Sequence, residues 1–102
     1  MAEVLSIDDL RDRIDVIDNQ LVRLLNVRVA CAVEVGRLKN EAGLPIYQPD
    51  RESQVLARVR ESATALSGPL TAEAVVRIFE RVIDEARRAE RVASDRRDNA
   101  ST

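Results

Sequence analysis

Two cationic side chains lie at a spacing that could build a binding site for an anion. Arg28 and Lys39 are eleven residues apart, which is close to three whole helical turns, so both would point to the same side of a helix. Only Ala32 and Val35 lie between them on that stripe, and small apolar residues of this kind could form the floor of a pocket. Two inward-facing cations over such a floor favour a compact dianion as ligand.

Each of these charges also has an ordinary explanation when it is taken alone. Arg28 could extend out of an apolar seam, and Lys39 could complement the negative end of a helix dipole. The bend "LPIYQPDRE" at residues 44–52 ends with Arg51 and Glu52, and acidic residues are common in the first turn of a helix. It is the convergence of several such residues that favours a pocket.

The composition excludes several kinds of chemistry. The 102 residues include no His and one Cys, which rules out structural zinc sites, Ser-His-Asp or Cys-His catalysis and intrachain disulfides. The three glycines form no phosphate-binding loop. We therefore expect no metal and no cofactor, and chemistry that depends on Arg, Lys, Glu and backbone amides. Cys31 is expected to be a small core residue.

Charge and hydropathy limit the partners and the location. The net charge of −2 and the sequence pI of about 5.2 argue against nucleic acid, because phosphate binding needs a basic surface. The start "MAEVLSIDDL" lacks the features of a signal peptide, and no apolar run approaches the roughly 18 residues of a membrane span. We expect a cytoplasmic protein without membrane contact.

Three helices are expected to position these residues, at about 6–41, 49–65 and 71–93. Ser6 and Asp9 form a capping box, after which apolar residues recur at intervals of three and four as far as Leu38. Gly43 and Pro45 then end the first helix. The chain is thus predicted to be one all-α domain over residues 1–93, with a polar, disordered tail over 94–102.

The two later helices have their own boundary signals. Pro49 suits the first position of the second helix, and Thr71 can cap the third. The apolar stripe of the third helix includes Phe79, Ile83 and Ala86.

The length of the first helix predicts a homodimer. About 34 helical residues span about 50 Å, whereas a compact domain of this size has a radius of gyration of about 13 Å. The helix must therefore protrude, and its apolar seam needs a partner. We expect an intertwined two-fold dimer with antiparallel long helices, each shorter pair folding over the other chain. A crossing near Arg23 and Leu24 would bring Arg11 opposite the partner's stretch from Arg28 to Lys39.

Three motifs, in this order and spacing, carry a specific resemblance. "LRDRIDVIDNQLVRLLNVR", "AVEVGRLK" and "PIYQPDRE" resemble the all-helical class of chorismate mutases, including the mutase domains fused to prephenate dehydratases. The resemblance covers residues 8 to about 92. It implies an intertwined dimer with two equivalent pockets and an isomerase that rearranges chorismate to prephenate, in the biosynthesis of phenylalanine and tyrosine.

The resemblance also implies roles for individual residues. Arg11 would be donated by the partner, and Arg28 would be its counterpart within the chain, both binding substrate carboxylates. Lys39 would contact a carboxylate and the ether oxygen. Arg51 would add positive potential, and Glu52 would accept a hydrogen bond from the substrate hydroxyl.

Two further positions depart from the pattern of some family members, and a third, Glu90, fits it. Gln48 stands where some have Asp, a mild change if the position acts through its backbone N–H. Ala86 replaces a Ser and loses one carboxylate contact. Glu90 occupies a position of Gln or Glu that donates a hydrogen bond to the ether oxygen, which a carboxyl group can do only when protonated.

Two alternative functions stay open at this point. Isochorismate-pyruvate lyases resemble these mutases and use a similar cationic pocket, although Glu52 and Glu90 fit the mutase pattern better. A non-catalytic dimerisation module or regulatory subunit would not explain why four cations converge on one place. The sequence also leaves open a fused or partner enzyme of the aromatic pathway.

Overall fold

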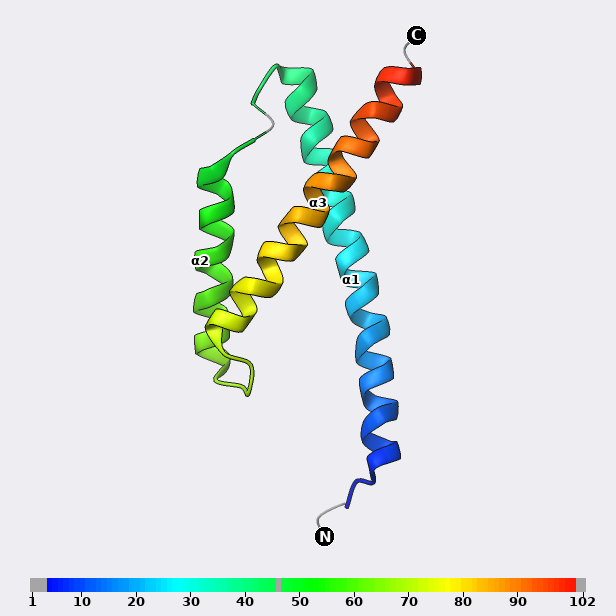
Figure 1. Ribbon diagram of the computed structural model, residues 1–102, viewed down its shortest axis with the longest axis vertical. Helices are drawn as coiled ribbons and strands as arrows, with labels where there is room; N and C mark the ends of the chain where they lie inside the picture. The colour runs from blue at the N-terminus through cyan, green and yellow to red at the C-terminus, as the bar shows by residue number, and fades with distance from the viewer. Residues whose placement is uncertain (1–3, 46, 101–102) are drawn as a thin grey trace.

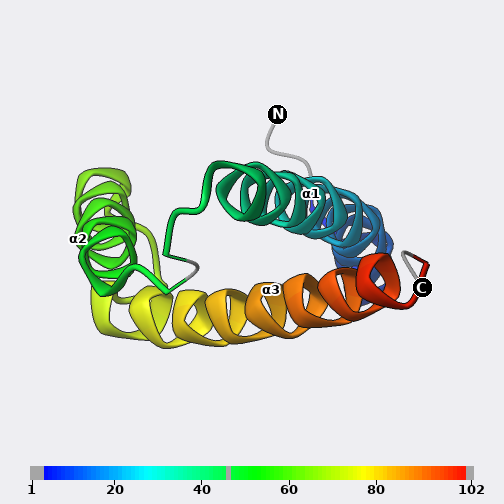
Figure 2. The same cartoon turned by 90° about the horizontal axis from the view of Figure 1, so that it is seen from above.

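The described residues form three helices, which confirms the predicted all-α fold. The computed structural model describes residues 4–45 and 47–100. In chain order the helices are α1 (Ile7–Ala42), α2 (Pro49–Leu66) and α3 (Ala72–Ala100). Figure 1 shows α3 crossing α1 obliquely and joining α2 at a short turn. Helix α3 packs against both other helices, and Figure 2 shows it running along one side of the molecule with α1 on the other.

Both ends of α1 are fixed by the residues that the sequence indicates. Ser6 Oγ accepts a hydrogen bond from the Asp9 N–H, and the Asp9 carboxylate accepts one from the Ser6 N–H, each at 3.0 Å. These bonds, above all the backbone one, hold the pKa of Asp9 below its ordinary value. At the other end Gly43 has φ 69°, a left-handed conformation that glycine adopts easily. The Leu44 N–H then donates to the Lys39 carbonyl oxygen at 2.9 Å.

The turn between α2 and α3 is also set by local chemistry. Helix α2 begins with Pro49, as predicted, and ends at Leu66, followed by Ser67 as its C-cap with φ 51°. Thr71 Oγ1 accepts a hydrogen bond from the Ala74 N–H at 3.1 Å, which confirms the predicted cap.

The third helix ends later than the sequence predicts. The expected limit was residue 93, followed by a disordered tail, whereas α3 continues to Ala100. The segment contains no Gly or Pro to end the helix. Ala93, Ser94 and Arg97 are half-buried and continue its inward-facing stripe. The prediction is therefore wrong for residues 94–100, and residues 101 and 102 lie outside the described part of the chain.

The first half of α1 projects from the rest of the molecule. The chain measures 65 × 28 × 17 Å, with a radius of gyration of 18.1 Å instead of the roughly 13 Å of a compact domain. Large apolar residues on this half of α1 are between 45% and 69% exposed, among them Ile7, Leu10, Ile14, Ile17, Leu21 and Leu24. An apolar surface of this extent is typical of an interface. None of the described helices combines the length and apolarity needed to cross a membrane.

Candidate active site

All but one of the predicted site residues surround a single cleft. The cleft has a volume of about 640 Å³ and is bordered by the second half of α1, the segment before α2, the first turns of α2 and the middle and later part of α3. The predicted residues that line it are Arg28, Lys39, Gln48, Arg51, Glu52, Ala86 and Glu90. Arg11 lies on the projecting half of α1 and does not line the cleft of its own chain.

The α1 wall has the arrangement that the spacing of its cations predicts. Arg28 and Lys39 both line the cleft, and Ala32 and Val35 lie between them along the same wall. The Arg28 guanidinium carbon lies 5.9 Å from the centre of the Phe79 ring, within the range of a cation–π contact. Arg28 is thereby held by α3 as well as by its own helix.

The structure corrects the expectation for Cys31. This residue was expected in the core but is exposed and borders the cleft. Neighbouring residues of α1, such as Arg28 and Gly36, do contact α3, whereas Cys31 lies on the wall of the cleft.

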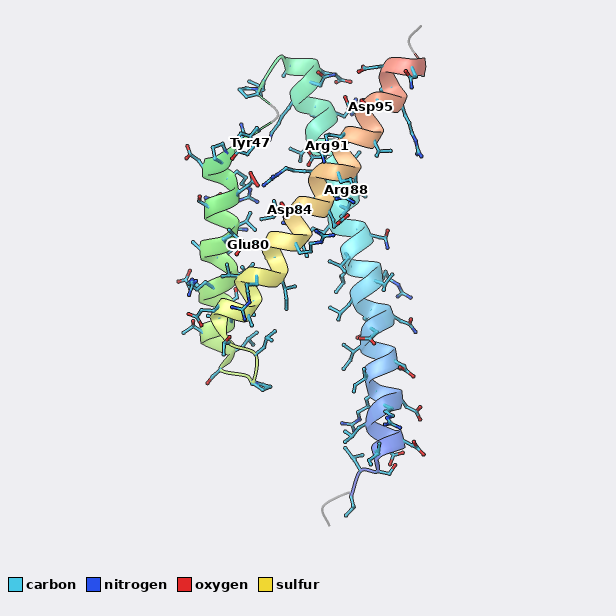
Figure 3. The ribbon with its side chains drawn as sticks, in the orientation of Figure 1. Tyr47, Glu80, Asp84, Arg88, Arg91 and Asp95 are labelled. Atoms are coloured by element: carbon cyan, nitrogen blue, oxygen red, sulfur yellow. The ribbon has the colours of Figure 1, made fainter. Side chains whose placement is uncertain are left out.

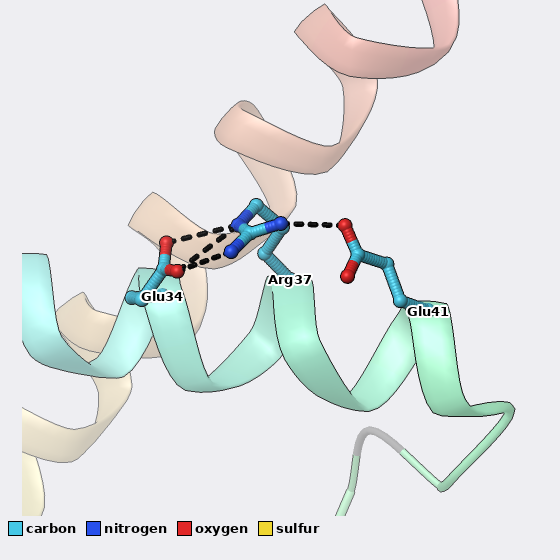
Figure 4. Close-up of polar contacts among 3 residues, drawn as sticks. All are labelled: Glu34, Arg37 and Glu41. Carbon is cyan, nitrogen blue, oxygen red and sulfur yellow. Dashed lines mark hydrogen bonds and ion pairs between the residues drawn. The ribbon is translucent and has the colours of Figure 1, made fainter.

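An ion-pair cluster stiffens the end of α1 that carries Lys39. Figure 4 shows Arg37 between Glu34 and Glu41, one turn away on either side. The Arg37 Nε atom donates to both Glu34 oxygens, at 3.1 and 3.0 Å. The hydrogen bond from Arg37 is the main reason why the pKa of Glu34 is lowered. Pairs at these spacings favour the helical conformation.

The first turn of α2 brings two charged residues to the cleft. The Glu52 N–H donates to the Gln48 carbonyl oxygen at 3.3 Å, which places both residues on the opening turn of the helix. Arg51 Nη1 donates to Gln54 Oε1 at 2.6 Å. The Glu52 carboxylate forms an ion pair with Arg87 of α3.

Glu90 lies at the side of the cleft where α3 approaches α1. Its carboxyl group lies over Gly36 of α1, and both residues are half-buried. Burial raises the pKa of Glu90 above its ordinary value, and the negative charge of Glu52 adds to the rise. Lys39 and Arg87 oppose the rise, with smaller effects than burial. Glu90 therefore retains its proton at a higher pH than an exposed glutamate does.

The electrostatic character of the cleft is positive. Among the described residues six cations line it, against the three carboxylates of Glu52, Glu90 and Asp95; the cations are Arg28, Lys39, Arg51, Arg87, Arg91 and Arg97. Such a cleft favours a small ligand that carries carboxylate groups.

Several residues that border the cleft could not be identified from the sequence, among them Tyr47, Arg87 and Arg91. Figure 3 shows Tyr47 before the start of α2, across from the middle of α3 where Arg91 lies. Arg87 precedes Glu90 by three residues and follows Ile83 by four. That helical spacing could have placed it on the inward-facing side with them.

The fold and the cleft define a class of protein: an all-helical domain with a cation-rich site for a small acidic ligand. Its sequence also matches a known family of that class. The chain belongs to the family described as chorismate mutase type II, which it matches over residues 10–91.

Individual relatives agree with this assignment. The chain is 48% identical to the T-protein of Enterobacter agglomerans over 60 residues, which cover 59% of this chain and 16% of that protein. It is 37% identical over 76 residues to a bifunctional chorismate mutase/prephenate dehydratase of Aquifex aeolicus, covering 74% and 21% of the two chains. Both matched segments are thus small parts of the relatives' length.

A solved structure of similar length has the same fold. The chorismate mutase of Thermus thermophilus superposes with a TM-score of 0.77 and 32% sequence identity. The superposition covers 83% of this chain and 93% of the other, so the likeness extends over nearly all of that enzyme.

Proposed function

We propose that this chain is a chorismate mutase, an isomerase that converts chorismate to prephenate for phenylalanine and tyrosine synthesis. The observation that carries the proposal is the cleft itself, in which Arg28, Lys39 and Arg51 face one small space. Membership of the family and the name of the Thermus thermophilus structure support the same reaction. The substrate is a dicarboxylate with one hydroxyl group, which suits a set of cations with a hydrogen-bond acceptor.

The proposed mechanism needs no covalent intermediate. A Claisen rearrangement proceeds when the substrate is held in a compact conformer and negative charge is stabilised at the ether oxygen. Positioning and preorganised electrostatics are effects that fixed cations supply. Lys39 contacts a carboxylate and the ether oxygen, while Arg28 binds a carboxylate. This assignment calls on no metal and no cofactor.

The remaining residues of the cleft complete the proposed site. Arg51 adds positive potential, and Glu52 accepts a hydrogen bond from the substrate hydroxyl. Gln48 acts through its backbone N–H at the start of α2. Ala86 lies at the floor with 4% exposure and provides shape without a polar contact.

A homodimer would complete this cleft with Arg11. The exposed apolar face of α1 supports a dimer, because a monomer would leave its Leu and Ile side chains in water. In an antiparallel pair of α1 helices, Arg11 of one chain approaches the stretch from Arg28 to Lys39 of the other. We therefore propose that each site takes one arginine from the partner subunit.

Glu90 is proposed to donate a hydrogen bond to the ether oxygen in its protonated form. A carboxylate has no proton to donate, so this contribution is lost as the pH rises through the pKa of Glu90. Because burial raises that pKa, protonated Glu90 persists to a higher pH than an exposed glutamate would.

We predict that the rate falls as the pH rises from acid to neutral and that Glu90→Gln flattens this dependence. The amide of Gln donates at every pH in this range. The measurement is kcat against pH for both proteins, with Glu80→Gln as a matched control on an exposed site of α3. A level profile in the unmutated protein would contradict the assignment.

The reaction can be tested directly. Chorismate disappearance, followed by ultraviolet absorbance, should be accompanied by the appearance of prephenate as the product. Incubation with isochorismate tests the lyase alternative, which predicts pyruvate release. Glu52 favours the mutase, since it can accept from the chorismate hydroxyl. If the protein converted neither substrate, the non-catalytic alternative would be preferred.

We also propose a partner enzyme and a cellular location for this protein. The relative from Aquifex aeolicus is named as a fusion of chorismate mutase with prephenate dehydratase, and this supports a partner or fused enzyme of the aromatic pathway here. The cytoplasm is the proposed location, as the sequence predicts.

A further inference from the structure

Arg87 contacts three different parts of the structure at the edge of the cleft. Its guanidinium forms an ion pair with Glu52 on the first turn of α2. The same guanidinium carbon lies 5.8 Å from the centre of the Tyr47 ring, in the segment before α2. Its Nη1 atom also lies 3.6 Å from the carboxylate of Asp84, one turn earlier on α3. The Arg87 side chain thus connects α3 to the first turn of α2 and to the segment that precedes it.

The contact between Arg87 and Glu52 lies where it can restrain the start of α2. Near the turn that joins the helices, Arg60 of α2 pairs with Glu73 of α3 at 2.9 Å. Figure 1 shows the two helices separating from that turn toward the start of α2. Among the described residues, the ion pair that joins the two helices at this open end is the one between Glu52 and Arg87. It therefore limits how far the start of α2 can move away.

The exposure of the two side chains and the contacts that Arg87 already makes indicate that Arg87 holds Glu52 in place. The Glu52 side chain is 22% exposed and that of Arg87 is 46% exposed, so the carboxylate is the more enclosed partner. The hydrogen bond to Glu52 is the main reason why the pKa of Arg87 is raised. A guanidinium that is already paired with Glu52 and placed over Tyr47 has fewer donors left for a substrate carboxylate.

We propose that Arg87 is a positioning residue that fixes the Glu52 carboxylate and Tyr47 at the α2 wall of the cleft. Held in this way, Glu52 presents an oriented acceptor to the substrate hydroxyl. This inference rests on the proposed function, in which Glu52 accepts that hydrogen bond. Arg87 itself acts through Glu52 and touches no reacting atom.

The first test is a double-mutant cycle on chorismate turnover. Arg87→Ala should lower kcat/KM about tenfold to a hundredfold, the range for a hydrogen bond to a charged group. Arg87→Lys should recover only part of this loss, because an ammonium group lacks the planar fork of donors. In a Glu52→Gln background, Arg87→Ala should have little further effect, since the group that it orients is already altered. Arg88→Ala is the matched control: Arg88 is adjacent, exposed and outside the cleft.

The second test detects the contact between Arg87 and Tyr47 without an activity measurement. Tyr47 is the single Tyr of a chain without Trp, so tyrosine fluorescence reports on this residue alone. Arg87→Ala should change the emission intensity and increase quenching by added acrylamide, a neutral quencher whose local concentration does not depend on the charge of Arg87, whereas Arg88→Ala should leave both unchanged. Thermal unfolding of each variant separates this effect from a loss of fold.

The outcomes distinguish the inference from the proposed function. If the unmutated protein is active but the losses from Arg87→Ala and Glu52→Gln simply add, Arg87 does not act through Glu52 and the inference is overturned. Equal fluorescence of the Arg87→Ala and Arg88→Ala variants would overturn it as well. An unmutated protein without activity on chorismate would instead overturn the proposed function, and with it any catalytic role for Arg87.

Discussion

Lys39→Ala is expected to lower kcat for chorismate by about a hundredfold to a thousandfold, the usual cost of removing one preorganised electrostatic contact in an active site. Lys39 is half-buried near the end of α1 and borders the cleft. In the proposed mechanism it is the cation nearest the breaking C–O bond. No other described cation on α1 borders the cleft on that last turn, so the charge would not be replaced from the same element.

The same substitution should leave the fold intact. The end of α1 is held by the Gly43 cap and by the ion pairs of Arg37, and both use groups other than the Lys39 side chain. Helical circular dichroism and the unfolding midpoint should therefore stay close to those of the unmutated protein. Arg58→Ala, which removes an exposed cation of α2 outside the cleft, should leave kcat within about twofold. Nearly unchanged turnover in Lys39→Ala would contradict the mechanism.

Features that depend on neighbouring residues could be predicted from the sequence. The capping box of Ser6 and Asp9 is a local pattern, and the structure contains both of its hydrogen bonds. The shared direction of Arg28 and Lys39 follows from helix geometry alone. The first two helices begin and end within one residue of their predicted limits. These parts of the fold require no knowledge of how the helices pack.

Features that depend on packing between helices could not be predicted in the same way. The extension of α3 to Ala100 uses half-buried positions such as Ser94 and Arg97, whose polar types suggested a solvated tail. The pairing of Arg87 with Glu52 joins residues 35 positions apart and depends on how α2 and α3 diverge. The sequence could place Arg87 on the correct side of its helix, but it could not indicate which carboxylate it meets.

The second large effect is expected at Arg11, which lies far from the cleft of its own chain. Arg11 and Arg28 are 17 residues apart on one continuous helix, or about 25 Å at 1.5 Å per residue. A direct contact with ligand in its own cleft is therefore excluded by distance. If Arg11 completes the cleft of the partner, Arg11→Ala should lower kcat/KM by about a hundredfold, as loss of a charged contact does. Without such a dimer it should have almost no effect.

The most direct test of the central claim, that cations from two subunits form each site, is complementation between two inactive variants. Arg11→Ala and Arg28→Ala proteins would be mixed under conditions that allow subunits to exchange. A mixed dimer has one site with both substitutions and one site with neither. Since about half of the dimers are mixed, activity should rise to about a quarter of the unmutated level. If the mixture instead keeps the mean activity of the two separate variants, each site is built from a single chain and the account is wrong.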